Sequence, residues 1–596
     1  MMEKKIKLTI DGIAVEVQEG QSILDAAKKV NVKIPTLCYH EDLCVAGNCR
    51  VCVVEVEGMR TLQASCAYPA QSGMVVNTNS AKVRKARKDI IGLLISEHST
   101  QCTTCYRSTN CELQELASEY NIDNDTYLSV LKPDFKVDKS SWSIEKDDRK
   151  CIRCQRCVRT CAELQGVNAI SVAHKGKDMG ISTFLDLPLN DVVCVNCGQC
   201  VNRCPTGALT ERRYFNEIWD AIGDPTKHVV MNTAPSVRVA LGEMLGYPVG
   251  ERVTGKMVTA MKKMGIDSVL DTDFSADLTI VEEGNELLKR LRKVVKDGNK
   301  EVKLPMITSC SPGWVKFIEH MYPDHLGHLS TCKSPQQMFG ALTKTYYAEK
   351  IGVKPEDIVS VAIMPCAAKK YEANRPEMND SEYRDVDCGL TTRELGHMIK
   401  QAGISFMDLK DSKYDNIMGE SSGAGVIFGA TGGVMEAALR TAYEVVTGRE
   451  VPFKNLNILA VRGEEGIKDA SIKIEGCLPE WSFLEGVELK VAIAHGLKNA
   501  RIIMDQIAAG ESPYHFIEIM ACPGGCIGGG GQPIPTNAEI RRKRTLAIYK
   551  EDMGMAIRKS HDNPEIIALY RDYLDEPLGH LSHKLLHTHY RKRNRY

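Results

Sequence analysis

The sequence predicts a multidomain protein in which cysteine-rich α+β modules precede a large α/β region. Its 596 residues are too many for one hydrophobic core, and a chain of this length usually forms about four domains. Most of its 23 cysteines gather into C-x2-C units before residue 205, which sets that part apart. Beyond residue 228, apolar strand-like runs alternate with amphipathic helices, a pattern typical of α/β folds with buried sheets.

The composition argues against several classes of protein. Basic and acidic residues number 76 and 77, so the overall charge indicates neither a nucleic acid nor an anionic membrane as partner. No run approaches the ~20 apolar residues of a membrane span, and the first residues lead directly into a strand pattern. We therefore expect a cytoplasmic protein. Clustered cysteines in a large unexported chain favour metal ligation over disulfides.

Residues 1–80 are predicted to form the first module. Alternating apolar residues around Asp11-Gly12 predict a β-hairpin over residues 5–17, and a helix pattern follows from Ser22. The spacing C-x10-C-x2-C-x13-C suits a [2Fe–2S] cluster, with structural zinc as the alternative. Its members are Cys38, Cys49, Cys52 and Cys66. This module resembles the β-grasp ferredoxin at the start of the electron-input subunit of respiratory NADH dehydrogenase, and it leaves Cys44 as a spare thiol.

Two further cysteine modules are expected at residues 81–125 and 140–212, joined by a polar, cysteine-free connection over residues 123–148. In the first, a helix over residues 84–97 leads to H-x3-C-x2-C-x5-C, which resembles a cluster module of the same dehydrogenase. Its predicted ligands are His98, Cys102, Cys105 and Cys111.

The second module carries two bacterial ferredoxin runs, in which the fourth cysteine ligates the other cubane. One [4Fe–4S] cluster is therefore assigned to Cys151, Cys154, Cys157 and Cys204. The other is assigned to Cys194, Cys197, Cys200 and Cys161. Together these sixteen ligands define an electron wire.

The region 213–540 is predicted to hold the active site. Strands are expected at residues 228–231, 360–364 and 456–461. Three loops carry unusual motifs, and α/β folds usually place their sites on such loops. They read Thr308-Ser309-Cys310-Ser311-Pro312-Gly313-Trp314, Met364-Pro365-Cys366-Ala367-Ala368-Lys369, and Cys522-Pro523-Gly524-Gly525-Cys526-Ile527-Gly528-Gly529-Gly530-Gly531. A phosphate loop is the rival for the last, but no Gly-Lys-Ser/Thr follows it.

These three loops resemble the signatures of iron-only hydrogenases, in particular the large subunits of multimeric, NAD(P)-linked and electron-bifurcating enzymes. The resemblance continues through residues 541–596, a small-subunit-like extension of the catalytic domain. It implies an H-cluster, a [4Fe–4S] cubane joined to a diiron centre with CO, CN and azadithiolate ligands. With one [2Fe–2S] and three accessory [4Fe–4S] clusters, this completes the expected cofactor set.

The resemblance also assigns roles to residues. Cys366, Cys522 and Cys526 are implied as cubane ligands, with Cys526 as the bridge, and Lys369 as the anchor of a cyanide. The implied walls and polar contacts are Met364, Met520, Phe428, Gln336 and Ser236.

The chain departs from the family at its first signature. The usual motif has two adjacent cysteines, a proton-relay thiol and a cubane ligand, whereas here Ser311 follows Cys310. The missing ligand could come from Ser311 as an alkoxide, from Cys310, or from Cys332. We expect Cys310 to be essential in any case, because a thiol donates protons near neutral pH far better than a hydroxyl.

A proton path is also expected. Glu283, Glu286 and Arg290 share one face of a predicted helix, which is a surface ion-pair network in most proteins. The same positions match the family's carboxylate relay, with Ser330 between the two glutamates.

The expected function is reversible interconversion of H2 with protons and electrons in an anaerobic cell. A trusted nucleotide motif is missing from the sequence, so we expect NAD(P)-reactive flavin and iron–sulfur partner subunits, or ferredoxin, to exchange the electrons. Two alternatives are an H2 sensor, although a signalling domain is absent from the sequence, and an electron-transfer subunit, which would leave the three loops without a role.

Overall fold

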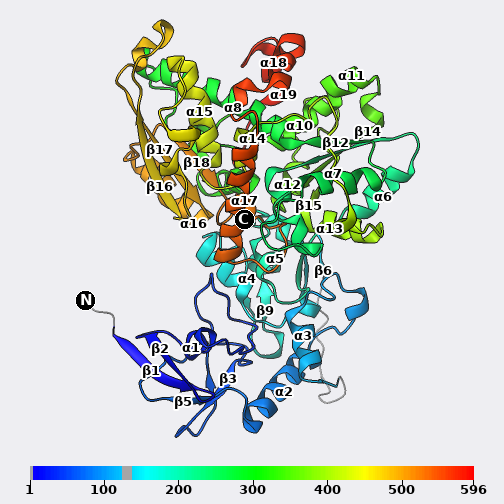
Figure 1. The fold of residues 1–596 in the computed structure, drawn as a ribbon, viewed down its shortest axis with the longest axis vertical. Helices are drawn as coiled ribbons and strands as arrows, with labels where there is room; N and C mark the ends of the chain where they lie inside the picture. Colours follow the sequence, from blue (N-terminus) through cyan, green and yellow to red (C-terminus); the bar gives the residue numbers. More distant parts are fainter. Residues whose placement is uncertain (1–3, 124–136, 596) are drawn as a thin grey trace.

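The predicted fold class, cysteine-rich modules followed by a large α/β region, is confirmed. A computed structural model describes residues 4–123 and 137–595. Figure 1 shows the N-terminal modules at one end of an elongated molecule and the α/β region at the other. Half of the predicted connection at residues 123–148, namely residues 124–136, lies outside the described residues.

The first module is a five-stranded sheet with one helix against it. The predicted hairpin is present, and the predicted helix is α1 (Ile23–Lys29), which begins with a capping box between Ser22 and Asp25. The sheet order is β2 (Ile13–Gln18), β1 (Lys5–Ile10), β5 (Val75–Asn77), β3 (Val53–Val56) and β4 (Gln63–Ala64). Its loops carry the four predicted ligands Cys38, Cys49, Cys52 and Cys66, all of which except Cys49 are buried.

The second and third modules are mostly loops and short helices. Helix α2 (Ala81–Ser96) ends just before His98, as predicted, and α3 (Glu112–Glu119) follows Cys111. The ferredoxin module is built on α4 (Arg156–Arg159), α5 (Gln199–Arg203) and two small sheets. These sheets contain β6 (Val137–Asp138), β7 (Ile144–Asp147) and β10 (Leu209–Glu211), and β8 (Ser171–Ala173) with β9 (Gly180–Ser182).

The α/β region has two four-stranded sheets. The first is parallel, in the order β12 (Ser268–Asp271), β11 (His228–Thr233), β14 (Ile358–Met364) and β15 (Cys388–Thr391). The second has the order β13 (Met306–Ile307), β18 (Phe516–Met520), β17 (Glu488–His495) and β16 (Ile467–Lys473), with β16 antiparallel. Their inner strands are almost continuously buried, as expected for sheets covered by helices on both faces.

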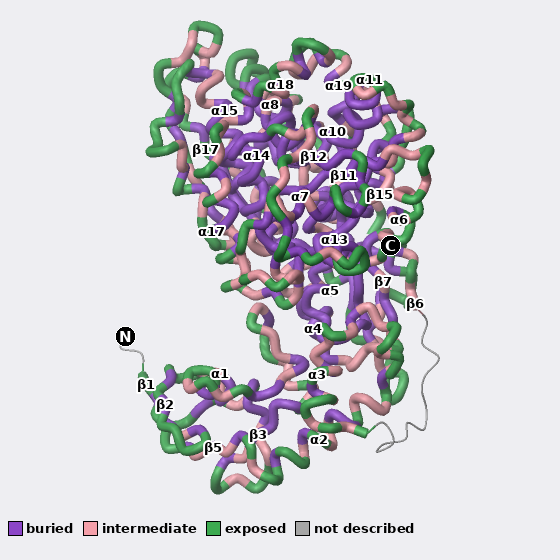
Figure 2. Tube along the Cα trace, turned by 45° about the vertical axis from the view of Figure 1, so that its right-hand side comes forward, coloured by how far each residue is buried: buried purple, intermediate pink, exposed green. Residues whose placement is uncertain are grey.

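Helix α8 (Thr272–Leu291) is the central helix of this region. It packs against α10 (Pro335–Leu342), α14 (Gly423–Ile427) and α15 (Gly433–Thr447). Because neighbours surround it, it is buried over most of its length (Figure 2). This position explains how a helix that is rich in acidic residues can carry carboxylates into the interior.

One predicted strand is wrong. The apolar run at residues 456–461 forms two short 3-10 turns, at Lys454–Leu456 and Leu459–Val461. Asn455 and Leu456 both have positive φ, which a strand does not allow, and Leu459 is 71% exposed. A short apolar run cannot by itself distinguish a strand from a packed turn.

The C-terminal segment is folded onto the α/β region. Helix α17 (Ala538–Gly554) contacts α14, and the predicted domain boundary at residue 540 falls inside it. Among the described residues, every helix is too short or too polar to cross a membrane.

Candidate active site

The carboxyl ends of four strands meet at one pocket between the two sheets. Strands β11 and β14 of the first sheet and β13 and β18 of the second each end at a loop that lines it. Such ends are where parallel α/β sheets place their ligand sites, since the strands stop and the loops diverge. All three motif loops singled out in the sequence therefore reach the same cavity.

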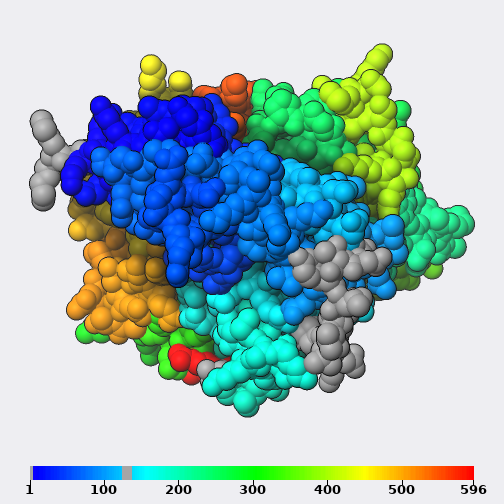
Figure 3. Space-filling model, turned by 90° about the horizontal axis from the view of Figure 1, so that it is seen from below, coloured from blue at the N-terminus to red at the C-terminus, as the bar shows by residue number. Residues whose placement is uncertain are grey.

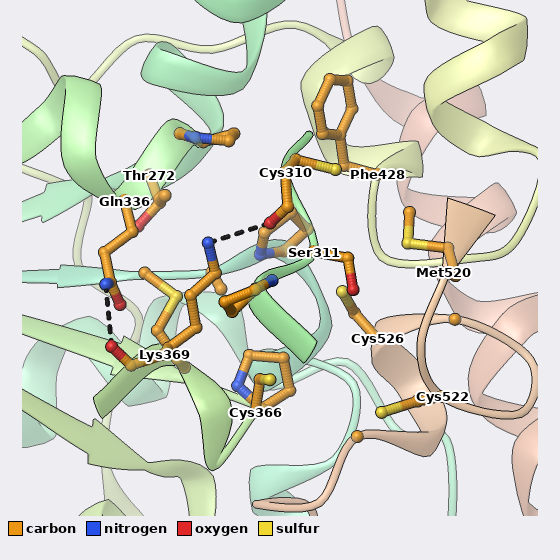
Figure 4. Close-up of a pocket in the computed structure, with 18 of the residues that line it drawn as sticks. Thr272, Cys310, Ser311, Gln336, Cys366, Lys369, Phe428, Met520, Cys522 and Cys526 are labelled. Atoms are coloured by element: carbon orange, nitrogen blue, oxygen red, sulfur yellow. Dashed lines mark hydrogen bonds between the residues drawn. The ribbon is translucent and has the colours of Figure 1, made fainter. Parts of the chain in front are cut away.

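The pocket brings together the three predicted cubane cysteines and two of the candidates for the remaining ligand, Cys310 and Ser311. Cys366, Cys522 and Cys526 line it, and so does Ser311, whose hydroxyl accepts a hydrogen bond from the Ala521 amide at 3.2 Å. In Figure 4, Cys366 and Cys522 lie in the lower half, and Cys526 and Ser311 lie between them and Cys310. Burial raises the pKa of Cys526 to about 12, so its thiolate needs a nearby positive charge.

The glycines of the third loop allow a very close approach of backbones. Gly525 has φ +90°, and a Cβ there would lie 2.6 Å from the Thr431 amide nitrogen. A Cβ at Gly529 would lie 2.1 Å from the carbonyl oxygen of Pro365. Side chains are therefore excluded where this loop meets the loop of Cys366, and the two cysteine-bearing loops can enclose a bulky group.

Lys369 brings the one positive charge that the sequence assigned to the pocket. Its ammonium donates hydrogen bonds to Glu372 Oε2 at 2.8 Å and to the Cys310 carbonyl at 3.1 Å. Gln336 Nε2 donates to the Lys369 carbonyl at 3.1 Å (Figure 4) and to Glu372 Oε2 at 3.2 Å. Glu372 received no role from the sequence, although its i,i+3 spacing from Lys369 was an available signal.

Most of the residues predicted to form the pocket walls and polar contacts line the pocket, but Ser236 does not. Met364, Phe428 and Met520 line the pocket. Ser236 lies one residue beyond the lining residue Pro235, and its hydroxyl accepts a hydrogen bond from Gln532 Nε2 at 3.2 Å. Thr272, at the start of α8, also lines the pocket, and nothing in the sequence pointed to it.

The residues of the predicted proton path lie between this pocket and the surface. Ser330 Oγ donates to Glu286 Oε2 at 2.8 Å, and Arg290 Nη2 donates to Glu286 Oε1 at 2.6 Å. Burial, and then the charge of Glu286, raise the pKa of Glu283 to about 8. Burial and the charge of Glu283 raise the pKa of the Cys310 thiol well above its usual value. A carboxyl that is protonated at neutral pH is therefore adjacent to the pocket thiol.

The cysteines of the ferredoxin module line two separate cavities. The first is lined by Cys151, Cys154, Cys157 and Cys204. The second is lined by Cys161, Cys194, Cys197 and Cys200. This is the crossed arrangement expected from the sequence, and α4, lying between Cys154 and Cys161, connects both cavities. The thiols offer each cavity the four sulfur ligands of a cubane.

The other cysteine groups adjoin these cavities. Cys52 and Cys66 of the first module have their sulfurs 3.3 Å apart. Arg159 of α4 donates hydrogen bonds to the carbonyls of Cys38, at 2.6 Å, and Cys44. In the second module, Cys105 lies so close to Gly207 that a Cβ there would be 2.9 Å from its sulfur. Both N-terminal groups therefore pack beside the ferredoxin module.

An ion-pair hub ties three parts of the chain together, and sequence reasoning missed it. Asp42 of the first module pairs with Arg203 of α5 at 2.6 Å and with Arg541 of α17 at 2.9 Å. The two arginines hold the pKa of Asp42 well below its usual range, despite its burial. The first module is thereby fixed against both the ferredoxin module and the C-terminal segment.

Family profiles match consecutive parts of the chain. The profile of the iron only hydrogenase large subunit, C-terminal domain, matches residues 227–530, and that of the iron hydrogenase small subunit matches residues 538–593. Three profiles cover the N-terminal part. They are a 2Fe-2S iron-sulfur cluster binding domain (3–81), an NADH-ubiquinone oxidoreductase-G iron-sulfur binding region (87–126) and a ferredoxin-like domain of NADH-quinone oxidoreductase subunit 3 (142–210).

Individual relatives agree with these profiles. The chain is 49% identical to the NADP-reducing hydrogenase subunit HndD of Solidesulfovibrio fructosivorans, over 99% of both chains. It is 38% identical to iron hydrogenase 1 of Clostridium pasteurianum, over 98% of this chain and 100% of that protein. A solved structure of a HydA1 variant, an [FeFe]-hydrogenase from Chlamydomonas reinhardtii, is 43% identical with a TM-score of 0.57, and the match covers 64% of this chain and 99% of that one.

The motif loops, the cavities lined by cysteines and the full-length similarity to two hydrogenases all agree. The chain belongs to the iron-only hydrogenase family, and the resemblance inferred from its motifs is confirmed.

Proposed function

We propose that this chain interconverts H2 with protons and electrons at the pocket between its two sheets, and exchanges the electrons with NADP(H) through a partner subunit. The observation that carries the proposal is the convergence of Cys310, Cys366, Cys522, Cys526 and Lys369 on one buried pocket, at the end of a series of cysteine-lined cavities. A subunit that only transferred electrons would not need this pocket.

The pocket fits the H-cluster that its family implies. Three buried thiols suit the cubane half, and the glycine loop leaves backbone rather than side chains around it. Gln336 Oε1 is buried and lacks a hydrogen-bond partner among the described residues, so it can accept one from the group. When bound, the H-cluster supplies the two-electron chemistry of H2, and the chain positions it and tunes its charge.

We assign the fourth cubane position to Ser311. Its hydroxyl lies in the pocket with the three thiols, whereas the Cys332 sulfur lies 3.8 Å from Glu286 Oε2, on the proton path. Cys310 is then free to act as the thiol that holds the proton nearest the pocket. Lys369 places a positive charge beside an anionic group, and Glu372 orients that ammonium.

Protons pass between Glu286 and Cys310 by way of Ser330 and Glu283. Arg290 and Ser330 hold Glu286 in place at the outer end. The Ser330 hydroxyl can both donate and accept, so it can relay a proton from one carboxyl to the next. Glu283, with its raised pKa, holds a proton at neutral pH and delivers it toward the Cys310 thiol.

Electrons follow the cysteine groups, which we take to hold one [2Fe–2S] and three accessory [4Fe–4S] clusters. The cavity of Cys161, Cys194, Cys197 and Cys200 is next to the pocket, because a Cβ at Gly198 would lie 3.1 Å from Gly530 of the glycine loop. The cavity of Cys151, Cys154, Cys157 and Cys204 lies one step further out, beside the second module. The chain therefore has two possible points of electron entry, one in each N-terminal module.

The partner is inferred to be an NAD(P)-reactive flavin and iron–sulfur subunit, with ferredoxin as a second electron carrier. The most similar relative described above is named as NADP-reducing, and two of the N-terminal profiles describe subunits of NADH-linked oxidoreductases. Both N-terminal modules lie on the face shown in Figure 3, where a partner can approach both. We place the complex in the cytoplasm.

The test is anaerobic maturation of the chain with an H2 uptake assay and infrared spectroscopy. We expect uptake with an artificial acceptor and infrared bands of bound CO and CN. Absence of those bands after maturation would contradict the proposal, and bands without turnover would favour an H2 sensor. Reduction of NADP by H2 only after a partner subunit is added would support the inferred acceptor.

A further inference from the structure

A group of three metal-binding side chains lies at the outer end of the proton path. One ligand atom each from Glu286, Cys332 and His587 lies within 4.8 Å of the other two, and all three residues are buried. Thiolate, imidazole and carboxylate are the three ligand types that Zn²⁺ takes in proteins. The group is separate from the cysteine-lined cavities, whose ligand sets do not include it.

The surroundings of His587 already have the form of a metal-binding histidine. Its Nε2 lies 3.1 Å from Glu282 Oε2, and its Nδ1 lies 2.8 Å from the Thr331 hydroxyl. Metal-bound histidines usually donate their second ring nitrogen to a carboxylate, which fixes the ring and its tautomer. Glu282 is itself held by Tyr570 and Ser582, so it can orient His587 Nε2 and leave Nδ1 for an ion.

An ion can reach this group from solvent. A surface cavity of about 320 Å³ is lined by Glu286, Thr331 and His587, and Cys332 lies buried behind them. The ring of His583 stacks on that of His587, with centroids 4.6 Å apart, and covers one face of it. Water in the cavity can take the fourth position of a tetrahedral shell.

Charges of both signs surround the group, and the negative ones lie nearer to where a cation would bind. The rim of the cavity carries cations, and Arg290 is paired with Glu286 at 2.6 Å. The cations at the rim are Lys289, Arg290, Lys293 and Lys303. Against them, the two buried carboxylates of Glu282 and Glu286 and the Cys332 thiolate would place three negative charges around a divalent ion. A sulfur ligand favours Zn²⁺ over Mg²⁺, which prefers oxygen.

We propose that Glu286, Cys332 and His587 form an inhibitory Zn²⁺ site, and that the bound ion closes the proton path. Binding forms a Zn–S bond and releases the thiol proton of Cys332 to solvent, without oxidation or reduction. The ion occupies the Glu286 carboxylate, which then cannot pass a proton to Ser330. The effect on turnover rests on the proposed function of Glu286, whereas the site itself does not.

Inhibition is measured on the matured enzyme as H2 uptake with an artificial acceptor, at increasing Zn²⁺. We expect reversible inhibition, with Mg²⁺ inactive at the same concentrations. Glu282→Gln should raise the Zn²⁺ concentration for half inhibition by ~10- to 100-fold, as expected for loss of the carboxylate behind a metal-bound histidine. Cys332→Ala and His587→Gln should raise it at least as much, each relative to its own activity without Zn²⁺.

Cys477→Ser is the matched control. Cys477 is a half-buried cysteine whose backbone amide donates a hydrogen bond to Glu485, and it is more than 100 positions along the chain from each residue of the site. This variant should be inhibited like the unaltered enzyme. Equal inhibition of the unaltered enzyme and Cys332→Ala would overturn the proposal, since it would show that the inhibitory ion binds at a site that does not include Cys332.

X-ray absorption at the zinc edge tests the site without turnover. The unaltered enzyme should show one Zn–S distance of ~2.3 Å with shorter Zn–N and Zn–O distances of ~2.0–2.2 Å, and Cys332→Ala should lose the sulfur. A spectrum without this Cys332-dependent sulfur would sink the site. A Zn–S signal that depends on Cys332, in an enzyme whose H2 uptake Zn²⁺ does not inhibit, would instead show that the ion leaves the proton path open. That result would overturn the proton role proposed for Glu286.

Discussion

Glu283→Gln gives the sharpest test of the proton path. Glu283 is 2% exposed, and burial raises its pKa to about 8, well above the usual value for a glutamate. The protonated form therefore exceeds the ionised form roughly tenfold at pH 7 and falls to roughly a tenth of it at pH 9. Glutamine keeps the shape of the side chain, but its amide does not ionise in this pH range and so cannot deliver a proton.

Loss of a positioned acid typically slows a reaction by about 10²- to 10⁴-fold, and we expect H2 production by Glu283→Gln to fall within that range. In the unaltered enzyme, production should decline as the pH rises through about 8, because Glu283 loses the proton that it delivers. Glu283→Asp, which keeps the carboxyl, should retain more activity than the glutamine variant.

The same pKa predicts a change in stability. A carboxyl whose pKa is raised by folding contributes stability that is complete below its unfolded pKa and is lost as the pH rises toward 8. The shift corresponds to a loss on the order of 5 kcal/mol over that interval. Glu283→Gln has no such titration, so its unfolding temperature should fall less between pH 5 and pH 8.

The assay is dye-driven H2 production across pH 6–9, with infrared detection of the protonated carboxyl. We expect a carboxylic acid band that disappears as the pH rises and is missing in Glu283→Gln. Production by Glu283→Gln within tenfold of the unaltered enzyme, with its clusters intact, would refute the reasoning. A carboxyl band unchanged across the range would refute the raised pKa.

Three further changes follow from the geometry. Ser311→Cys should shift the electron paramagnetic resonance of the pocket cubane while retaining turnover; an identical spectrum would exclude Ser311 as ligand. Gly525→Ala should lose H2 activity but keep the accessory cluster signals, because its Cβ would lie 2.6 Å from a backbone nitrogen; normal activity would contradict the close packing. Asp42→Asn should lower the free energy of unfolding by about 3–5 kcal/mol, because the buried Arg203 and its neighbour Arg541 both lose their carboxylate partner. It should also slow electron delivery from the first module. Stopped-flow reduction of the cluster in that module, compared with dye-driven turnover, would detect the slower delivery, and an unchanged rate would contradict the role of Asp42.

The sequence predicted the site better than the surrounding fold. Metal ligands occur at short, fixed spacings, so Cys151 to Cys161 and Cys522 to Cys526 could be recognised without a structure. The relay glutamates could be placed on one helix face because Glu283 and Glu286 are three residues apart. Neither inference depends on long-range packing.

What the sequence did not predict depends on residues that are far apart along the chain. Asp42 meets Arg541 across 499 positions, and the contact of Cys332 with Glu286 spans 46. Local patterns carry no information about such pairs. The run at 456–461 was misassigned for the same reason, since only tertiary packing distinguishes its turns from a strand.

The crossed cysteine groups have a consequence for biosynthesis. The cavity lined by Cys151, Cys154 and Cys157 is completed only by Cys204, and the cavity begun by Cys161 is completed only by Cys194 to Cys200. As the chain leaves the ribosome, neither cavity can acquire its full ligand set until residues 194–204 have emerged. A truncation between residues 161 and 194 would therefore yield a chain with neither cavity complete, so the two clusters should be gained or lost together.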